Sequence, residues 1–186
     1  MKIYENDEIY VRPLLESDTN KENYLQWFYD QEVCRYNSHG KMSHGRDYSK
    51  PGINPNKHIV WAVIKKEYKK IGENIPYTDE ELHIGNVNLN IDWINRNAEF
   101  TCIFGEKKYW GKGYCTQALQ WIIAHGFTKL NLHKIWLGTC NPGMIKAAQN
   151  TKMLLMNMIK EDVFINGQFE DIHRLEIYKR DFNNDK

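Results

Sequence analysis

The sequence predicts a mixed α+β domain in which a central, mostly antiparallel sheet is flanked by helices. Short apolar or alternating runs of strand length recur along the chain and are interleaved with a few helical patterns. Two pairs of these runs are separated by turn sequences, Asn95-Arg96-Asn97 and Asn166-Gly167, which favours antiparallel hairpins. At 186 residues, the simplest organisation is a single domain spanning 1–186.

Composition and charge restrict the class of protein. Hydrophobic residues make up 41% of the chain and charged residues 26%, as in soluble globular domains. The formal net charge of +1 argues against a protein that coats nucleic acid or a membrane surface, and we find no spanning apolar run and no signal peptide. The four cysteines form no CxxC pair and the seven histidines have no ligand spacing, so we expect no metal site, no disulfide framework and a cytoplasmic location.

The first third of the chain predicts a strand, a helix and an irregular segment. Ile9 to Leu14 is a weakly alternating strand that proline ends, and Ser17-Asp18 caps a helix with one apolar face. Asp30 to Asn56 has little periodicity and is rich in Ser, Gly, His, Asn and Pro. Long irregular segments in compact domains are often functional, but a plain surface loop explains this one equally well.

The middle of the chain predicts three strands. His58 to Ile64 is a short apolar run, whereas Lys65 to Glu81 is charged and interrupted by Gly, Asn and Pro, which predicts a connection. Ile84 to Ile94 alternates and, with Ala98 to Phe104, predicts an antiparallel pair. The second strand of this pair leads into a glycine-bearing turn.

That turn, Lys108 to Gln117 (KYWGKGYCTQ), opens into a helical pattern that reaches about Asn131. A turn between a strand and a helix exposes backbone N–H groups without helical partners, and the helix dipole favours an anion there. Gly111 and Gly113 permit positive φ, while Lys108 and Lys112 add charge to the rim. The spacing is neither the dinucleotide fingerprint nor a Walker loop, so on these residues alone phosphate binding and an ordinary turn are both open.

The last third predicts another strand at His133 to Thr139, a helix that starts at Asn141-Pro142-Gly143, and two final strands. The final strands are Met153 to Ile159 and Gln168 to Tyr178. We find no internal repeat, heptad array or low-complexity segment.

Lys108-x-x-Gly111-x-Gly113 resembles the pyrophosphate-binding signature of the GNAT acyltransferase superfamily. Further phrases resemble its RimJ/RimL-type and spermidine-acetyltransferase branch, from about Ile9 to Ile177: VRPLLESD, IGNVNLNIDWINRNAEF, YWGKGYCTQAL, LNLHKIWL and NGQFEDIHRLEI. The resemblance implies an acetyl-CoA-dependent N-acetyltransferase. It also implies a GNAT-like sheet in which the strand before the loop and the strand after its helix splay apart at the acetyl-CoA site.

The resemblance further implies which residues bind acetyl-CoA, the co-substrate. The pantetheine arm would pair with the strand before the loop, and the loop and the following turn would hold the pyrophosphate. The residues so assigned are Phe100, Thr101, Cys102, Ile103, Phe104, Lys108, Tyr109, Trp110, Gly111, Lys112, Gly113, Tyr114, Cys115, Thr116 and Asn141. For Tyr109 and Trp110, stacking on a ligand and core packing are both open.

Amine acetylation needs a base, a polarised thioester carbonyl and a proton for the thiolate. Glu99 is the candidate base, since it matches the family's Ala-Glu-Phe phrase, although a salt bridge with Arg96 or a lysine is an equal alternative. Asp92 and Asp171 are weaker candidates, and a structural role fits Asp171 as well. The backbone N–H of Cys102 or Ile103 is a candidate donor to the carbonyl. The cysteines are better explained as core residues than as nucleophiles.

The stretch NPGMIKAAQNTKML departs from the family pattern. Many members carry a tyrosine there that protonates the thiolate, but Ala148 holds that position, and Lys152-Met153 replaces a Gly-Phe turn. The RimL branch often lacks this tyrosine. The general acid is therefore unassigned, with solvent and Tyr114 as the remaining candidates, and the helix is expected to run longer or end differently.

For the acceptor, a resemblance of EVCRYNSHG (32–40) to enzymes of surface-polysaccharide clusters favours a small amine of the amino-sugar or sugar-nucleotide class. Polyamines come next, which an acidic pocket would favour, and then protein N-termini. An acyl-CoA-binding module without turnover and a plain domain that binds nothing are the competing hypotheses. The terminal hairpin suggests a possible homodimer.

Overall fold

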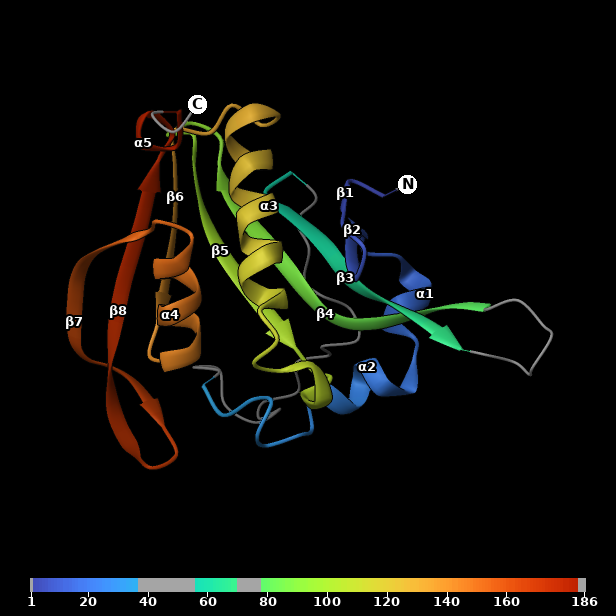
Figure 1. Cartoon of the computed structure of the whole chain (residues 1–186). Helices are drawn as coiled ribbons and strands as arrows, with labels where there is room; N and C mark the ends of the chain where they lie inside the picture. Colours follow the sequence, from blue (N-terminus) through green and yellow to red (C-terminus); the bar gives the residue numbers. More distant parts are fainter. Residues whose placement is uncertain (1, 37–55, 70–77, 184–186) are drawn as a thin grey trace.

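A computed structural model describes residues 2–36, 56–69 and 78–183 of the chain. In this part, the strands form one eight-stranded sheet with the order β1-β2-β3-β4-β5-β6-β8-β7 (Figure 1). All neighbours are antiparallel except β5 and β6, which are parallel. The strands are β1 (Tyr4–Glu5), β2 (Ile9–Pro13), β3 (His58–Lys69), β4 (Thr78–Asp92), β5 (Asn97–Phe104), β6 (Lys134–Thr139), β7 (Leu154–Ile165) and β8 (Gln168–Tyr178).

Helices lie against both faces of this sheet. The long helix α3 (Tyr114–Thr128) connects β5 to β6, and α4 (Pro142–Asn150) connects β6 to β7; both lie on the same face (Figure 1). The short helices α1 (Glu16–Thr19) and α2 (Glu22–Trp27) follow β2, and α5 (Lys179–Asn183) follows β8. A 3-10 turn, η1 (Lys107–Tyr109), precedes α3.

The main core lies between α3 and the sheet. Alternate residues of β4 and β5, such as Leu89 and Phe100, share one buried cluster with residues spaced by three or four along α3, such as Leu119 and Ile122. A period of two in the strands and of 3.6 in the helix therefore brings both apolar faces together. The mixed, mostly antiparallel α+β architecture that the sequence predicts is confirmed.

The opposite face of the sheet is covered by α2. His83 precedes the core residue Ile84, so its ring points to the other face, where it stacks on Tyr24 and contacts Trp27. Trp27 also lies where a side chain on Gly105 would be, which explains glycine at the end of β5. The apolar cluster on this face is small and consists of Tyr10, Ala62 and Ile64 with Leu14 against it.

Several expectations about element boundaries were wrong. β7 continues to Ile165 rather than ending at Ile159, and Ser17-Asp18 lie inside α1, whose N-cap is Leu15. Residues 65–69 and 78–81 continue β3 and β4 as a hairpin rather than forming a connection. Cross-strand pairing extends these strands beyond their apolar parts, which a reading of hydrophobicity misses. The first helix is two short helices, because the chain turns between Thr19 and Glu22.

The turn between β7 and β8 is the one that the sequence predicts. Asn166 and Gly167 both have positive φ, at 52° and 90°, as a type I′ turn between β7 and β8 requires. No helix in the described part of the chain is long and apolar enough to cross a membrane.

Candidate active site

A gap between β5 and β6 organises the candidate site. The two strands pair at three positions, Asn97 to Glu99 against Lys134 to Trp136. Beyond them β5 continues to Phe104 against β4, while β6 continues to Thr139 against β8, and Figure 1 shows the two strands separating. The edge of β5 from Phe100 to Phe104 thus faces the gap. Backbone groups on such an edge are available to an extended ligand.

The glycine loop lies at the end of this strand. Gly111 and Gly113 have φ of 72° and 82°, and a side chain at either position would meet no atom of the described residues within 4 Å. Gly113 is the N-cap of α3, with no side-chain cap. The first N–H groups of α3 therefore have no side-chain cap, and they lie next to two residues without side chains. That is the arrangement an anion needs.

The rim of the loop carries Lys108, Lys112 and Trp110. The two ammonium groups lie 4.7 and 5.2 Å from the ring centroid of Tyr109, and Lys108 also lies 3.4 Å from Glu67. The indole of Trp110 is partly exposed and donates a 2.7 Å hydrogen bond to the carbonyl of Phe104. This bond fixes the loop to the end of β5. Thr116 is half-buried in the first turn of α3.

Two tyrosines assigned to cofactor binding have buried side chains. Tyr109 and Tyr114 are each 6% exposed, belong to the main core and lie with ring centroids 6.2 Å apart. The burial of the Tyr109 ring favours core packing over stacking on a ligand. The hydroxyl of Tyr114 donates to Glu8, and burial together with Glu8 raises its pKa. Tyr114 is thus directed toward β2, which argues against the general acid that the sequence left open.

Glu99 lies at the point where β5 and β6 separate. It is half-buried and lies opposite Asn90 on β4 and Trp136 on β6. Since Ala98 and Phe100 point into the core, Glu99 points to the other face of the sheet, with Thr101. There the amide of Asn88 donates to the Thr101 hydroxyl at 3.0 Å. A polar strip of β4 and β5 thus follows the gap on the face opposite α3.

The two weaker carboxylates have structural partners. Asp92 accepts from the N–H groups of Ile94 and Asn95, which closes the turn between β4 and β5, and these bonds lower its pKa. Asp171 pairs with Lys160 at 2.7 Å and accepts from the N–H of Glu161 in an irregular part of β7, which lowers its pKa. Asp92 lies on the same face as the polar strip but at its far end, where β4 turns into β5, and Asp171 lies on β8.

Sulfur atoms gather on the core side of the same gap. Cys102 on β5 and Cys115 on α3 lie with their Sγ atoms 3.8 Å apart, and the Sδ atom of Met144 on α4 is close to both. The cysteine contact and burial raise the pKa of Cys115 well above its ordinary value, so its thiol is protonated at neutral pH. Both cysteines contribute to the interior, as expected. The contact with Met144 was not predicted, because it joins residues from three separate elements.

The divergent stretch after Asn141 keeps a regular helix end. Asn141 is the N-cap of α4 and accepts from the N–H of Gly143 at 2.9 Å, so its side chain has a structural role. At the other end, Lys152 takes a left-handed conformation with φ of 65°. Lys152 and Met153 donate to the carbonyls of Gln149 and Ala148 at 3.0 and 3.1 Å. This is a Schellman motif with lysine in place of glycine. The expectation of a longer or different helix end was wrong.

Ala148 itself is fully buried on the inner side of α4. Its methyl group supplies no proton, so the residue at the family's tyrosine position has no acid–base role here.

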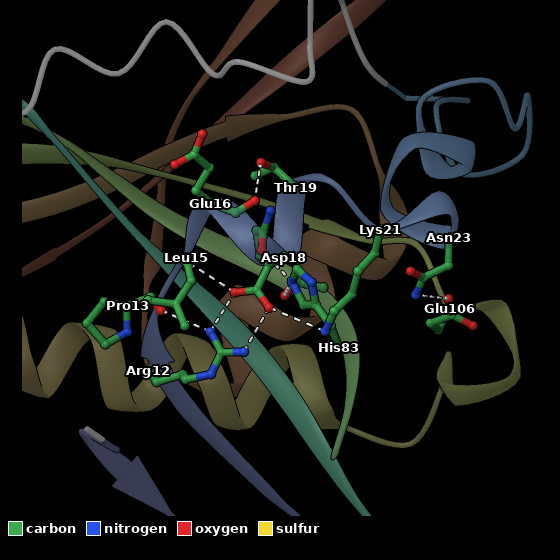
Figure 2. A network of polar contacts seen from close by, with 12 residues as sticks. Arg12, Pro13, Leu15, Glu16, Asp18, Thr19, Lys21, Asn23, His83 and Glu106 are labelled. Carbon is green, nitrogen blue, oxygen red and sulfur yellow. Dashed lines mark hydrogen bonds and ion pairs between the residues drawn. The ribbon is translucent and has the colours of Figure 1, made fainter. Parts of the chain in front are cut away.

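The chain between β2 and α2 is fixed by a buried ion pair. The Asp18 carboxylate is fully buried and accepts from both Nη atoms of Arg12, at 2.5 and 2.8 Å, and from the N–H of Leu15 (Figure 2). Burial raises the pKa of Asp18, but the Arg12 and Leu15 hydrogen bonds outweigh it, so the pKa lies below its ordinary value. The charge of Asp18 is therefore neutralised within the protein.

Beside this ion pair, an acidic pocket opens between α2 and the end of β5. It encloses about 410 Å³ and is lined by Glu22, Asn23, Gln26, Trp27, Asp30, Gly105 and Glu106. Three of these seven described residues are carboxylates and none is a cation. Glu106 is oriented by Trp27 and Asn23, which donate to it at 3.1 and 3.3 Å. Asp30 is paired with Lys107 at 2.8 Å, which lowers its pKa.

The sequence indicated only part of this pocket. Asp30 begins the irregular segment that the sequence indicates as a functional candidate, but Glu106 is distant from it in the chain and was not predicted. The larger part of that segment, 37–55, lies outside the described residues.

Fold and site together define an acyltransferase of the acetyl-CoA-dependent kind. Residues 8–153 match the acetyltransferase (GNAT) domain family, and the chain belongs to that family. It is 33% identical over 151 residues to spermidine N(1)-acetyltransferase of Vibrio cholerae, covering 71% of this chain and 87% of that protein. It is 30% identical over 96 residues to spermidine N(1)-acetyltransferase of Escherichia coli strain K12, about half of each chain.

The fold has close structural relatives. The crystal structure of spermidine N-acetyltransferase from Vibrio cholerae in complex with CoA and spermine superposes with a TM-score of 0.75 at 23% identity, covering 96% of this chain and all of that one. A second structure, of the spermidine/spermine N-acetyltransferase from Vibrio cholerae in complex with manganese ions, gives 0.68 at 21% identity, covering 96% and 97%. The family resemblance is thus confirmed, and acetyl-CoA is the co-substrate.

Proposed function

We propose that this N-acetyltransferase transfers acetyl from acetyl-CoA to a primary amine of a polyamine of the spermidine type. The acidic pocket between α2 and β5 carries this proposal, because its described lining holds three carboxylates and no cation, and only Asp30 is paired with a lysine next to the pocket, Lys107. A polyamine carries several ammonium groups along an apolar chain, and carboxylates beside an indole suit both features.

For the cofactor, the proposal assigns the pyrophosphate to the loop at Gly111 and Gly113. Its support is the pair of positive φ values, the open space in front of both glycines and the uncapped N-terminus of α3. The pantetheine arm would lie along the edge of β5 from Phe100 to Phe104, which β6 leaves after Trp136. A short extended ligand there would pair with the strand as a further strand does.

For the acceptor, the names of the relatives agree with the pocket. Both relatives named above are spermidine acetyltransferases, and one structural relative was crystallised with spermine. The preference for an amino sugar or sugar nucleotide has no support from these relatives or from the pocket. A protein N-terminus carries one ammonium group, so it makes less use of three carboxylates.

In the reaction, the attacking amine must first lose its proton. Alkyl ammonium groups have pKa values near that of lysine, about 10.4, so a base increases the reactive fraction. We assign this role to Glu99, directly or through a water, because it lies on the polar strip where β5 and β6 part. The backbone N–H of Cys102 or Ile103 would polarise the carbonyl. Since Ala148 carries no proton, we assign protonation of the leaving thiolate to solvent.

The test is a panel of amines with acetyl-CoA, with products separated by chromatography because the protein's own thiols react with thiol reagents. We expect kcat/KM to be highest for spermidine or spermine and lower for glucosamine and for an alanine-initiated peptide. In the double variant Glu22→Gln/Glu106→Gln, KM for spermidine should rise about tenfold, since each exposed charge pair is worth up to about 1 kcal/mol. Glutamine at position 106 retains an oxygen that can accept the hydrogen bond from the Trp27 indole, so the variant removes the charge and keeps this contact.

Glu16→Gln is the matched control, because this exposed glutamate of α1 does not line the pocket. It should leave KM unchanged. A higher kcat/KM for glucosamine, or an equal KM in the double variant, would contradict the proposed acceptor. Binding of acetyl-CoA without acetylation of any amine would favour the binding module instead.

Two further proposals concern the cellular context. We place the protein in a reducing compartment such as the cytoplasm, because its four cysteines are free thiols. We also propose a homodimer through β7, an edge strand on which Leu154, Leu155 and Met156 are more than half exposed. Light scattering that gives the mass of one chain would exclude the dimer.

A further inference from the structure

Three sulfur atoms from three elements meet beside the gap between β5 and β6. The separations are 3.8 Å from Cys102 to Cys115, 3.6 Å from Cys102 to Met144 and 3.8 Å from Cys115 to Met144. Cys102 and Phe104 face the core side of β5, Cys115 is the second residue of α3, and Met144 lies in the first turn of α4. The three atoms therefore form a nearly equilateral triangle.

The size of this triangle matches trigonal metal coordination. A point equidistant from three atoms with these separations lies about 2.2 Å from each of them. Metal–thiolate bonds are about 2.3 Å long. A metal ion at the centre would thus need sulfur movements of only about 0.1 Å, compared with closure from 3.8 Å to about 2.05 Å for a disulfide between the two cysteines.

The donor set selects the kind of metal. Thiolate and thioether sulfur are soft ligands that favour Cu(I), whereas Zn²⁺ in structural sites takes four tetrahedral ligands. The described residues contain no cluster of three or more histidine, cysteine, aspartate or glutamate side chains suited to a metal. The sulfur triangle differs from such a cluster because its third ligand is a methionine.

We propose that Cys102, Cys115 and Met144 form a binding site for one thiophilic monovalent metal ion, Cu(I). On binding, each thiol loses its proton to solvent and both thiolates bond to the ion, while the thioether binds as a neutral ligand. Copper remains Cu(I), two protons are released, and the complex carries one net negative charge.

The position of Cys115 suits that negative charge. Cys115 lies in the first turn of α3, where the helix dipole stabilises negative charge. Binding should therefore tighten as pH rises, because two protons leave with each ion.

The consequence for the enzyme rests on the proposed cofactor site. An ion held by Cys102 would occupy the core side of the strand along which the pantetheine arm would lie. Copper should then weaken acetyl-CoA binding, and acetyl-CoA should weaken copper binding by the same factor.

The site itself is tested without acetyl-CoA. The full chain is titrated anaerobically with Cu(I) in the presence of ascorbate and a chromophoric Cu(I) chelator, and retained copper is measured per chain. We expect one ion per chain, with three sulfur neighbours at about 2.3 Å by X-ray absorption. Met144→Leu should weaken binding at least about tenfold and Cys115→Ser at least about 100-fold, since even outer-shell changes cost 10- to 100-fold.

Cys140→Ser is the matched control, because Cys140 is also a half-buried free thiol but lies outside the triangle. It should retain copper as the wild type does. Equal retention by Cys115→Ser or Met144→Leu, or a coordination shell with two sulfur atoms, would overturn the proposal. So would an intrachain Cys102–Cys115 disulfide that forms readily while the reduced chain retains no copper. Circular dichroism checks that each variant folds.

Discussion

The face of the sheet under α3 and the face under α1 and α2 are stabilised by different interactions. Under α3, a continuous apolar cluster joins the helix to the strands, and the glycine loop at its start is defined by backbone geometry. Under α1 and α2, the apolar cluster is small, and polar contacts such as Arg12–Asp18 and Trp27–Glu106 position the chain. The face under α3 therefore depends on packing, and the face under α1 and α2 depends on charge. We call them the cofactor face and the acceptor face, after the proposed ligands.

This difference matches what each face binds in the proposal. A pyrophosphate is the same in every acetyl-CoA, so backbone N–H groups are sufficient to hold it. An acceptor amine varies between enzymes, and side-chain charges such as Glu22 and Glu106 can be exchanged without disturbing the core. We expect the two faces to respond separately to mutation and to pH.

The largest effect is expected on the acceptor face. Asp18→Asn leaves Arg12 beside a neutral partner in a buried setting, and loss of one partner of a buried pair costs about 3–5 kcal/mol of unfolding free energy. Urea denaturation measures this loss. The double variant Arg12→Met/Asp18→Leu should recover most of it, because it removes both charges. A loss under about 1 kcal/mol in Asp18→Asn would show that the ion pair does not anchor this face.

The same pair gives a pH dependence. Because the folded state lowers the pKa of Asp18, its contribution is present above the unfolded value of about 3.9 and is lost as pH falls below it. The free energy of unfolding of the wild type should therefore fall more steeply than that of the double variant as the pH decreases from about 4 to about 2. If the free energy of unfolding changed with pH in the same way for both proteins, the lowered pKa of Asp18 would be contradicted.

The next effect separates chemistry from cofactor binding. Glu99→Gln should lower kcat by about 10²- to 10³-fold, the usual contribution of a general base, and leave the Kd of acetyl-CoA unchanged. Steady-state kinetics and calorimetry measure the two quantities. Glu170→Gln makes the same change at a glutamate of β8 and is the control, for which kcat should stay as in the wild type. An unchanged kcat in Glu99→Gln would remove this residue from the mechanism.

A smaller effect is expected at the glycine loop. Gly111→Trp places a large side chain in the open space before α3 and should weaken acetyl-CoA binding about 100-fold, or about 2.7 kcal/mol. Gly167→Trp introduces the same side chain at a glycine with similar positive φ and open space, but in the β7–β8 turn. The Gly167→Trp variant should bind acetyl-CoA with the affinity of the wild type. Equal affinity in both variants would exclude the loop as the pyrophosphate site.

The smallest effect concerns the end of α4, on the cofactor face. Lys152→Gly should stabilise the protein by about 0.5 kcal/mol, since it relieves left-handed strain of about 1 kcal/mol but adds freedom to the unfolded chain. Thermal unfolding measures the gain. Lys152→Ala keeps the strain and should show no gain. Stabilisation in both variants would point to the lysine side chain rather than to the backbone.

The two faces also differ in how far the sequence predicts them. The apolar parts of β2 to β8, the helix α3 and the Asn166-Gly167 turn are local patterns, and the sequence predicts them, although it misses β1 and the full lengths of β3, β4 and β7. Contacts between distant residues were not predicted: Trp27 with Glu106, and Met144 with Cys102 and Cys115, join elements whose proximity only the folded sheet creates. The end of α4 was misjudged because two backbone hydrogen bonds keep the motif without its glycine.

The separation of β5 from β6 has a consequence for handling the protein. It leaves two strand edges in the middle of the sheet, and in the part of the chain that the structure describes no strand pairs with β5 on that side beyond Glu99. Unpaired edges are templates for aggregation. A bound acetyl-CoA would cover them as well as stabilise the fold, by about 2.7 kcal/mol at a concentration about 100 times its Kd. If acetyl-CoA binds along β5 as proposed, it should therefore also reduce self-association of the protein.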